Sequence, residues 1–222
     1  MNYGLLVKNS KGETIVDGVS YMCQIIKTGT ETMIASSSTD IIYTPTTAKV
    51  DCFFRSTDYI SPAARKKSDG TLTISQRFWK NSADVEYAVA QIGRGRGLPT
   101  GYGIDIRGDT ESEVLNTSLR SLRWHDQFSR SFTWPQTTNY DGWLAGPYTD
   151  NFSELKTLPY VVINDLTYSN LDNFGGGQAW ATDIFRVTTS SITWGTWITV
   201  GPEYFITANA GSPMTATILR EK

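Results

Sequence analysis

The chain opens with the stretch Tyr3-Gly4-Leu5-Leu6-Val7-Lys8, and the same pattern returns 99 positions later as Tyr102-Gly103-Ile104-Asp105-Ile106-Arg107. Both copies read Tyr-Gly, then an alternating apolar stretch that ends in a cation. Seven residues beyond each cation lies a second apolar pair followed by Asp or Asn, at residues 15–17 and 114–116. The gapless match indicates an internal repeat, and a repeat defines the architecture before any local pattern does.

Each copy of the repeat predicts a β-hairpin. Residues 3–8 alternate with a period of two, residues 9–12 form a polar turn with a glycine, and residues 13–16 return as the second strand. In the second copy, residues 110–122 also fit a helix, because Thr110 and Glu113 match a capping box and leucines follow at helical spacing. The match to the first copy favours the hairpin, with the helix as the alternative.

The rest of the 222-residue chain also predicts strands. Short runs rich in β-branched and aromatic residues are separated by turn signals about every 8–12 residues, which is typical of sandwiches and barrels. Residues 93–101 contain four glycines and Pro99, so they cannot continue a regular element. We therefore expect an all-β fold of two related β-sandwich-like units, with an N-terminal unit over 1–92, a Gly-rich linker over 93–101 and a C-terminal unit over 102–222.

The charge pattern and the cysteines narrow the class of protein. The net charge is −2 and the only basic block is residues 65–67, so we expect no nucleic-acid partner and no polybasic membrane anchor. The first residues lack a signal-peptide pattern, and no apolar run reaches the roughly 18 residues of a membrane span. We expect a protein made in a cytoplasm, without a membrane partner. Cys23 and Cys52 lie in apolar stretches, which predicts buried free thiols.

No set of residues forms a convincing catalytic or metal-binding pattern. His125 is the only histidine and precedes Asp126, but no nucleophile motif accompanies this pair. A single histidine also excludes a site with several histidine ligands. Asp141, Asp150 and Glu154 are the carboxylates that a glycoside hydrolase would need, although their separation cannot be read from sequence. We predict no catalytic residue, no metal site and no cofactor, and therefore no enzyme, and keep a polysaccharide or cell-wall hydrolase as a third alternative.

Aromatic residues concentrate where the strand pattern is weakest. Residues 135–157 show no clear periodicity, which predicts a long loop, and long loops are commonly functional or mobile. The candidate contact surface consists of Trp134, Tyr140, Trp143 and Tyr148. Such side chains fill cores, anchor subunit interfaces or stack on sugar rings, and the sequence leaves all three interpretations open.

The hairpin at residues 3–17 resembles the opening of many small virion proteins of tailed bacteriophages. Those proteins begin Tyr-Gly-Leu, continue through an Asn/Ser/Gly turn, and close the hairpin with aliphatic residues and Asp. The second copy follows a strand-like stretch at 85–90, which resembles the placement of this hairpin in such proteins, but its turn at 110–112 lacks the glycine. The resemblance implies a structural role in the tail or particle and no catalytic residues.

These observations together predict a structural, tail-associated component of a tailed bacteriophage virion, at the tip, the baseplate or a fibre attachment. It would be located in the virion, form a homo-oligomer and contact other virion proteins, since β-rich subunits with aromatic contact residues suit symmetric assemblies. The alternative is a receptor- or glycan-binding module of the virion that contacts a host surface glycan.

Overall fold

The computed structural model describes residues 7–8, 14–16, 23–34, 38–43, 49–76, 82–92, 105–107, 113–116, 120–130, 141–164, 170–171, 179–200 and 214–221. All regular structure within these ranges is β-strand, which confirms the all-β class. None of the described residues belongs to a helix long and apolar enough to cross a membrane.

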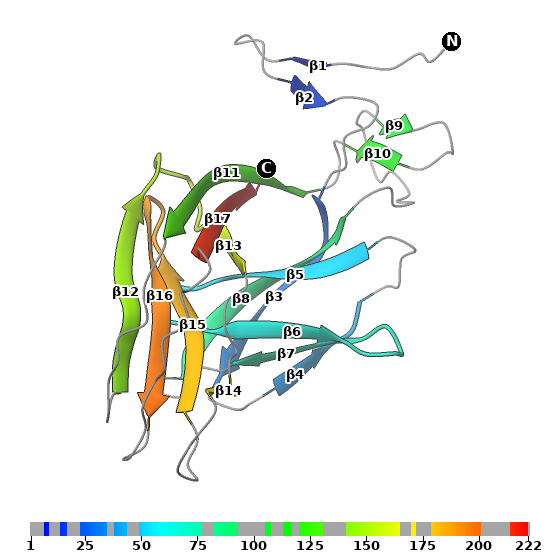
Figure 1. The fold of residues 1–222 in the computed structure, drawn as a ribbon. Coiled ribbons are helices and arrows are strands. Elements are labelled where there is room, and N and C mark those ends of the chain that lie inside the picture. Colours follow the sequence, from blue (N-terminus) through cyan, green and yellow to red (C-terminus); the bar gives the residue numbers. More distant parts are fainter. Residues whose placement is uncertain are drawn as a thin grey trace.

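Six antiparallel strands close a barrel at the centre of the molecule (Figure 1). Around the barrel the order is β11-β17-β13-β5-β8-β3. Their bounds are β3 (Cys23–Met33), β5 (Lys49–Arg55), β8 (Ala83–Ile92), β11 (Ser121–Arg130), β13 (Tyr160–Asn164) and β17 (Met214–Glu221). Closure gives each of these strands a neighbour on both sides, so the barrel has no free edge.

Two further sheets flank the barrel. One has the order β4-β7-β6, with β4 (Ser38–Ile41), β7 (Leu72–Gln76) and β6 (Pro62–Lys66). The other has the order β12-β16-β15-β14, with β12 (Asp141–Asn151), β16 (Ser191–Val200), β15 (Ala179–Val187) and β14 (Asn170–Leu171). Figure 1 shows the β12 sheet on the left of the barrel and the β4 sheet at the lower right.

Both copies of the Tyr-Gly repeat form hairpins. β1 (Val7–Lys8) pairs with β2 (Thr14–Val16), and β9 (Asp105–Arg107) pairs with β10 (Glu113–Asn116). The hairpin predicted for the second copy is confirmed, and the helical alternative is wrong. The registers are identical, because a shift of 99 positions carries Lys8–Thr14 onto Arg107–Glu113 and Val7–Val16 onto Ile106–Leu115. Each hairpin also skips one residue at the same point.

The repeat continues into the barrel, where the sequences no longer show it. β3 has a register shift at Ile26 in its pairing with β8, and β11 has one at His125 in its pairing with β17. These two residues are again 99 positions apart. The partner strands correspond as well. The first residue after each shift is Lys27 or Asp126, and these residues pair with Val89 of β8 and Ile218 of β17. Each half of the chain therefore contributes three barrel strands in the same order, β3-β8-β5 and β11-β17-β13.

The two halves of the barrel are related by an approximate two-fold axis. Cys23 of β3 pairs with Leu122 of β11, and these two residues are equivalents in the repeat. Self-pairing of equivalent residues is what a two-fold axis between antiparallel strands produces. The prediction of two sandwich-like units is not confirmed, because three strands from each half close one barrel. The predicted linker at 93–101 lies outside the described residues.

The core is shared between the halves. One cluster of buried side chains includes Met33 and Ile74 from the first half together with Trp194 and Met214 from the second. The flanking sheets repeat the order β4-β7-β6 as β12-β16-β15. Their central strands bury equivalent positions, with Leu72, Ile74 and Gln76 of β7 matched by Ile192, Trp194 and Thr196 of β16. A second cluster also draws on both halves, with Ile25 and Phe53 from the first and Leu122 and Tyr160 from the second.

Candidate functional site

The predicted aromatic loop is in part a strand. Residues 141–151 form β12, so the prediction of a patternless loop over 135–157 is wrong for this segment. Its register against β16 shifts between Trp143 and Ala145 and again between Ala145 and Tyr148. Gly146 lies in the left-handed region at a φ of 95°. These irregularities destroy the period-two pattern that identifies a strand in sequence.

Trp143 lies at the centre of an aromatic cluster formed by Tyr59, Trp143, Arg186 and Trp197. Its ring meets Tyr59 edge to face at 5.5 Å and Trp197 at 5.6 Å. The Arg186 guanidinium lies 4.6 Å from the centre of the Tyr59 ring. The three rings are half-buried. Edge-to-face pairs contribute about 0.5–1.5 kcal/mol each beyond area burial, so these rings stabilise one another.

The aromatic cluster also joins the two halves of the chain. Tyr59 belongs to the connection between β5 and β6, and the neighbouring Ile60 forms a two-way backbone bridge with Phe185 of β15, at 2.9 Å in each direction. Ser61 Oγ lies 2.6 Å from Oγ1 of Thr182, which also belongs to β15. The first half therefore covers part of the β15 edge. That edge would otherwise expose unpaired backbone groups.

The other predicted aromatic residues are not part of this cluster. Tyr148 packs against the buried Trp194 at 5.9 Å, with the Arg130 guanidinium 5.7 Å from its ring centre. Trp194 and Trp197, the β16 partners of Tyr148 and Trp143, are three positions apart and so lie on opposite faces of the sheet. Trp134 and Tyr140 lie outside the described residues. The structure does not bring Trp143 and Tyr148 onto one surface.

Asp150 is a buried structural carboxylate. Its Oδ2 accepts a 2.8 Å hydrogen bond from Trp194 Nε1, and its Oδ1 accepts one from the Arg130 guanidinium. In the first half, Ile41 stands at the position equivalent to Asp150 and Ile74 at the position equivalent to Trp194. Both isoleucines are buried. Both oxygens of Asp150 are thus engaged by side chains that need them. Glu154 is exposed, and the side chain of Asp141 lies outside the described residues.

His125 and Asp126 do not act as a pair. His125 Nε2 lies 3.2 Å from the carbonyl oxygen of Ser153, and its ring meets Phe152 at 5.6 Å. The Asp126 carboxylate instead accepts the backbone N–H of Gln127. Among the residues with described side chains, no cluster of three or more His, Cys, Asp or Glu could hold a metal ion.

Both cysteines are free, as predicted, but they are half-buried rather than fully buried. Burial, reinforced by the charge of Asp51, raises the pKa of Cys23 to about 12, and the same two causes raise the pKa of Cys52 to about 12. A thiol is nucleophilic only as the thiolate, so these groups are unreactive near neutral pH.

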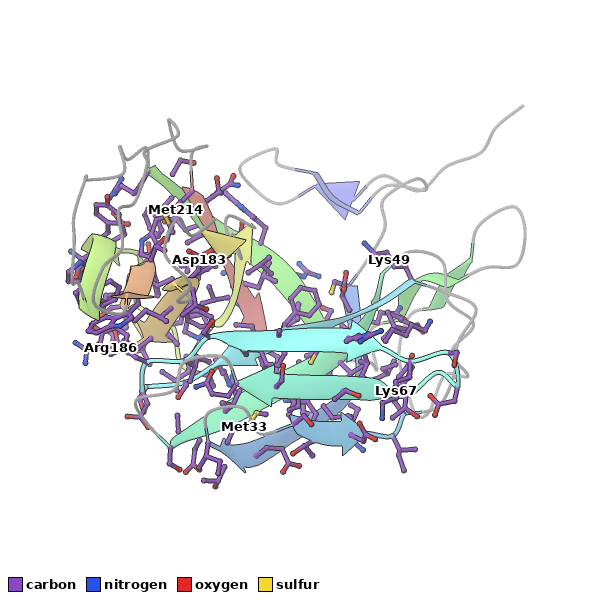
Figure 2. All side chains as sticks on the ribbon, turned by 60° about the horizontal axis from the view of Figure 1, so that its bottom comes forward. Met33, Lys49, Lys67, Asp183, Arg186 and Met214 are labelled. Atoms are coloured by element: carbon purple, nitrogen blue, oxygen red, sulfur yellow. The ribbon has the colours of Figure 1, made fainter. Side chains whose placement is uncertain are left out.

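A second surface feature is an open hollow of about 1150 Å³ on the β4-β7-β6 sheet, which we call the polar hollow. Its lining is Ser38, Thr39, Asp40, Arg65, Lys66, Lys67, Ser68, Asp69, Thr73 and Ser75. Figure 2 shows Lys67 and Arg186 on opposite sides of the molecule, so the polar hollow and the aromatic cluster are separate surfaces. In the sequence, residues 65–67 stand out only as a charge block, because the other lining residues are brought to them by the pairing of β4, β7 and β6.

No protein-family model matches the chain, and no similar protein was found among curated proteins or among solved structures.

Proposed function

We propose that the protein is a structural, tail-associated component of a tailed bacteriophage virion, at the tip, the baseplate or a fibre attachment. It acts by assembling with further copies of itself and with other virion proteins. The observation that carries this proposal is the pair of hairpins β1–β2 and β9–β10, which share one register and lie outside the barrel (Figure 1).

Isolated hairpins call for a partner. A two-stranded hairpin is marginally stable in water, and a third strand or a packed face is normally needed. Within the described part of the chain, neither hairpin bonds to a third strand. The same element with the same bulge occurs in both halves, which favours a role in contacts that are made twice. The Tyr-Gly-Leu resemblance of the first hairpin also supports a virion protein.

The proposal is tested on purified phage particles. Quantitative mass spectrometry should find the protein in a fixed, symmetry-related number of copies per particle. Its absence from washed particles would overturn the proposal.

The hairpins are tested by Val16→Pro in β2 and Leu115→Pro in β10, the equivalent position. Proline removes a ladder donor, so each hairpin should open while the barrel persists. We expect unchanged thermal unfolding of the purified protein and reduced incorporation into particles. Lys156→Ala, an exposed change outside both hairpins, is the control. If both proline variants are incorporated normally, the hairpins have no role in assembly.

A second candidate function is a receptor- or glycan-binding module of the virion. The observation that favours it is the hydroxyl-lined polar hollow, since sugars are recognised through several convergent polar groups. Glycan-array binding by the wild type and by Trp143→Ala separates this surface from the aromatic cluster. No observation favours the hydrolase alternative, because both oxygens of Asp150 are engaged.

A further inference from the structure

We infer that the polar hollow is a binding site for an acidic polysaccharide, a chain of hydroxyl-bearing sugars that also carries carboxylates. This inference specifies a ligand class for one surface and does not require the protein to be a virion component.

The shape of the hollow follows from two cross-strand rows. Ser38, Ser75 and Ala63 stand side by side on β4, β7 and β6, and so do Asp40, Thr73 and Arg65. Side chains of alternate residues point to the same face of a sheet, so both rows face away from the buried Leu72 and Ile74. The first row is made of small residues, of which Ser38 and Ser75 line the hollow. All three residues of the second row line it.

The acidic side chains of the polar hollow already have hydrogen-bond partners within the protein. Asp40 Oδ2 accepts a 2.5 Å hydrogen bond from Lys67 Nζ, and Asp40 Oδ1 accepts one of 2.7 Å from Thr73. These bonds hold the pKa of Asp40 below its usual value, with the Lys67 bond as the largest cause. Asp69 accepts the backbone N–H of Thr71 at 2.8 Å. Both acids are therefore occupied locally.

Two cations of the lining, Arg65 and Lys66, have no ion-pair partner among the described residues, and of these two Arg65 stands in the outward-facing row beside Thr73. The Arg65 side chain is exposed. A guanidinium binds a carboxylate through two parallel hydrogen bonds, which gives both strength and orientation. Ser38 and Ser75 of the first row offer hydroxyls that donate to or accept from sugar hydroxyls.

The lining favours an acidic sugar over other anionic partners. Single-stranded nucleic acids need aromatic side chains on which bases stack, and none lines the hollow. A docked protein would need an apolar centre with aromatic anchors, which the hollow also lacks. Hydroxyls around one uncommitted guanidinium fit a ligand with many hydroxyls and spaced carboxylates.

The approximate two-fold repeat supplies a matched comparison. On the second flanking sheet, Arg186 is the equivalent of Arg65, and Thr149 and Thr193 are the equivalents of Asp40 and Thr73. There the arginine is stacked on Tyr59. Arg186 is thus stacked within the protein, whereas its equivalent Arg65 lines the hollow. Arg186→Gln is therefore a charge-matched control for Arg65→Gln.

The test is calorimetric titration of the full-length protein with oligogalacturonate, neutral dextran and oligothymidylate at low ionic strength. We expect binding of oligogalacturonate only. Arg65→Gln should weaken it at least about tenfold, because it removes the charge-assisted hydrogen bonds of the guanidinium, and Arg186→Gln should leave it unchanged. Asp40→Asn should strengthen binding several-fold, because it frees Lys67 and removes a negative charge from the hollow. A damaged fold cannot produce that gain.

Three outcomes overturn the inference: no binding of oligogalacturonate, equal binding of oligothymidylate, or equal effects of Arg65→Gln and Arg186→Gln. Thermal unfolding of each variant shows whether a loss reflects folding. Binding is measured on the isolated protein, so its failure leaves the particle test untouched, and absence from particles leaves the sugar site untouched.

Discussion

Gly29 lies directly opposite Tyr87 in the pairing of β3 with β8, and the Tyr87 ring occupies the space beside it. A Cβ atom added to Gly29 would lie 2.4 Å from Tyr87 Oη. At the equivalent place in the second half, Phe128 lies opposite Ala216. The large and the small residue have exchanged strands, so the two halves fill the same space by complementary choices.

This exchange predicts that Gly29 and Tyr87 can be replaced together at a lower cost in stability than separately. Gly29→Ala should lower the free energy of unfolding by about 1–3 kcal/mol, because the buried Tyr87 ring must move. Tyr87→Ala should cost about 3–5 kcal/mol by leaving a cavity. The double variant Gly29→Phe with Tyr87→Ala copies the second half. We expect urea unfolding to show it at least about 1 kcal/mol more stable than the sum of its two single changes, Gly29→Phe and Tyr87→Ala.

The control for this cycle is Thr28→Ala, an exposed change on the same strand that should stay within about 0.5 kcal/mol of the wild type. If the costs of Gly29→Phe and Tyr87→Ala simply add in the double variant, the two residues do not fill this space as a pair, and the prediction is wrong.

Local patterns predicted the fold class and the hairpins but not their assembly. Period-two alternation identified the first hairpin, and the 99-position match identified the second where helical signals competed. The barrel was not predictable, because its closing contacts join Cys23 to Leu122, and Phe54 to Val161. Such long-range pairing depends on sheet twist and core shape, which no local window records.

The candidate site was predictable only in part. Trp143 stood out by its type, but its partner Tyr59 is far away in sequence and comes from a connection without a strand pattern. The bulges of β12 concealed that Trp143 and Tyr148 lie on opposite faces. The polar hollow could not be predicted from the sequence, because its residues share no motif and are brought together only by the strand order β4-β7-β6.

The Asp150 network predicts a specific loss of stability. Asp150→Ala leaves the Trp194 indole N–H and the Arg130 guanidinium without their acceptor in a mostly buried setting. Breaking a buried pair costs about 3–5 kcal/mol, and partial exposure of Arg130 brings the expected loss to about 2–3 kcal/mol. Urea unfolding measures it, with the adjacent exposed change Thr149→Ala as control. A loss below about 0.5 kcal/mol would show that the carboxylate has no structural role and would reopen a chemical one.

The cysteines predict a dependence of stability on alkaline pH. Unfolded thiols ionise near pH 9.0, whereas Cys23 and Cys52 in the folded protein have pKa values raised to about 12. Their contribution is therefore complete below pH 9 and is lost as the pH rises toward 12, by up to about 1.4 kcal/mol per pH unit for each thiol. Denaturant unfolding near pH 8 and near pH 10.5 measures the loss. The variant with Cys23→Ala and Cys52→Ala should lose less over this interval, and equal losses would contradict buried neutral thiols.

Trp143→Ala tests whether the aromatic cluster has a packing role or is available for contact with a partner. Trp143 is held edge to face between Tyr59 and Trp197, so Trp143→Ala should cost about 2 kcal/mol, less than a fully buried ring. Its coupling to Tyr59→Ala in a double-mutant cycle should be about 0.5–1.5 kcal/mol. The control is Trp124→Ala on β11, whose side chain is 63% exposed and should cost less than about 0.5 kcal/mol. If both tryptophans cost equally little, the Trp143 ring contributes nothing to folding and is available to a partner, which would return it to the proposed contact surface.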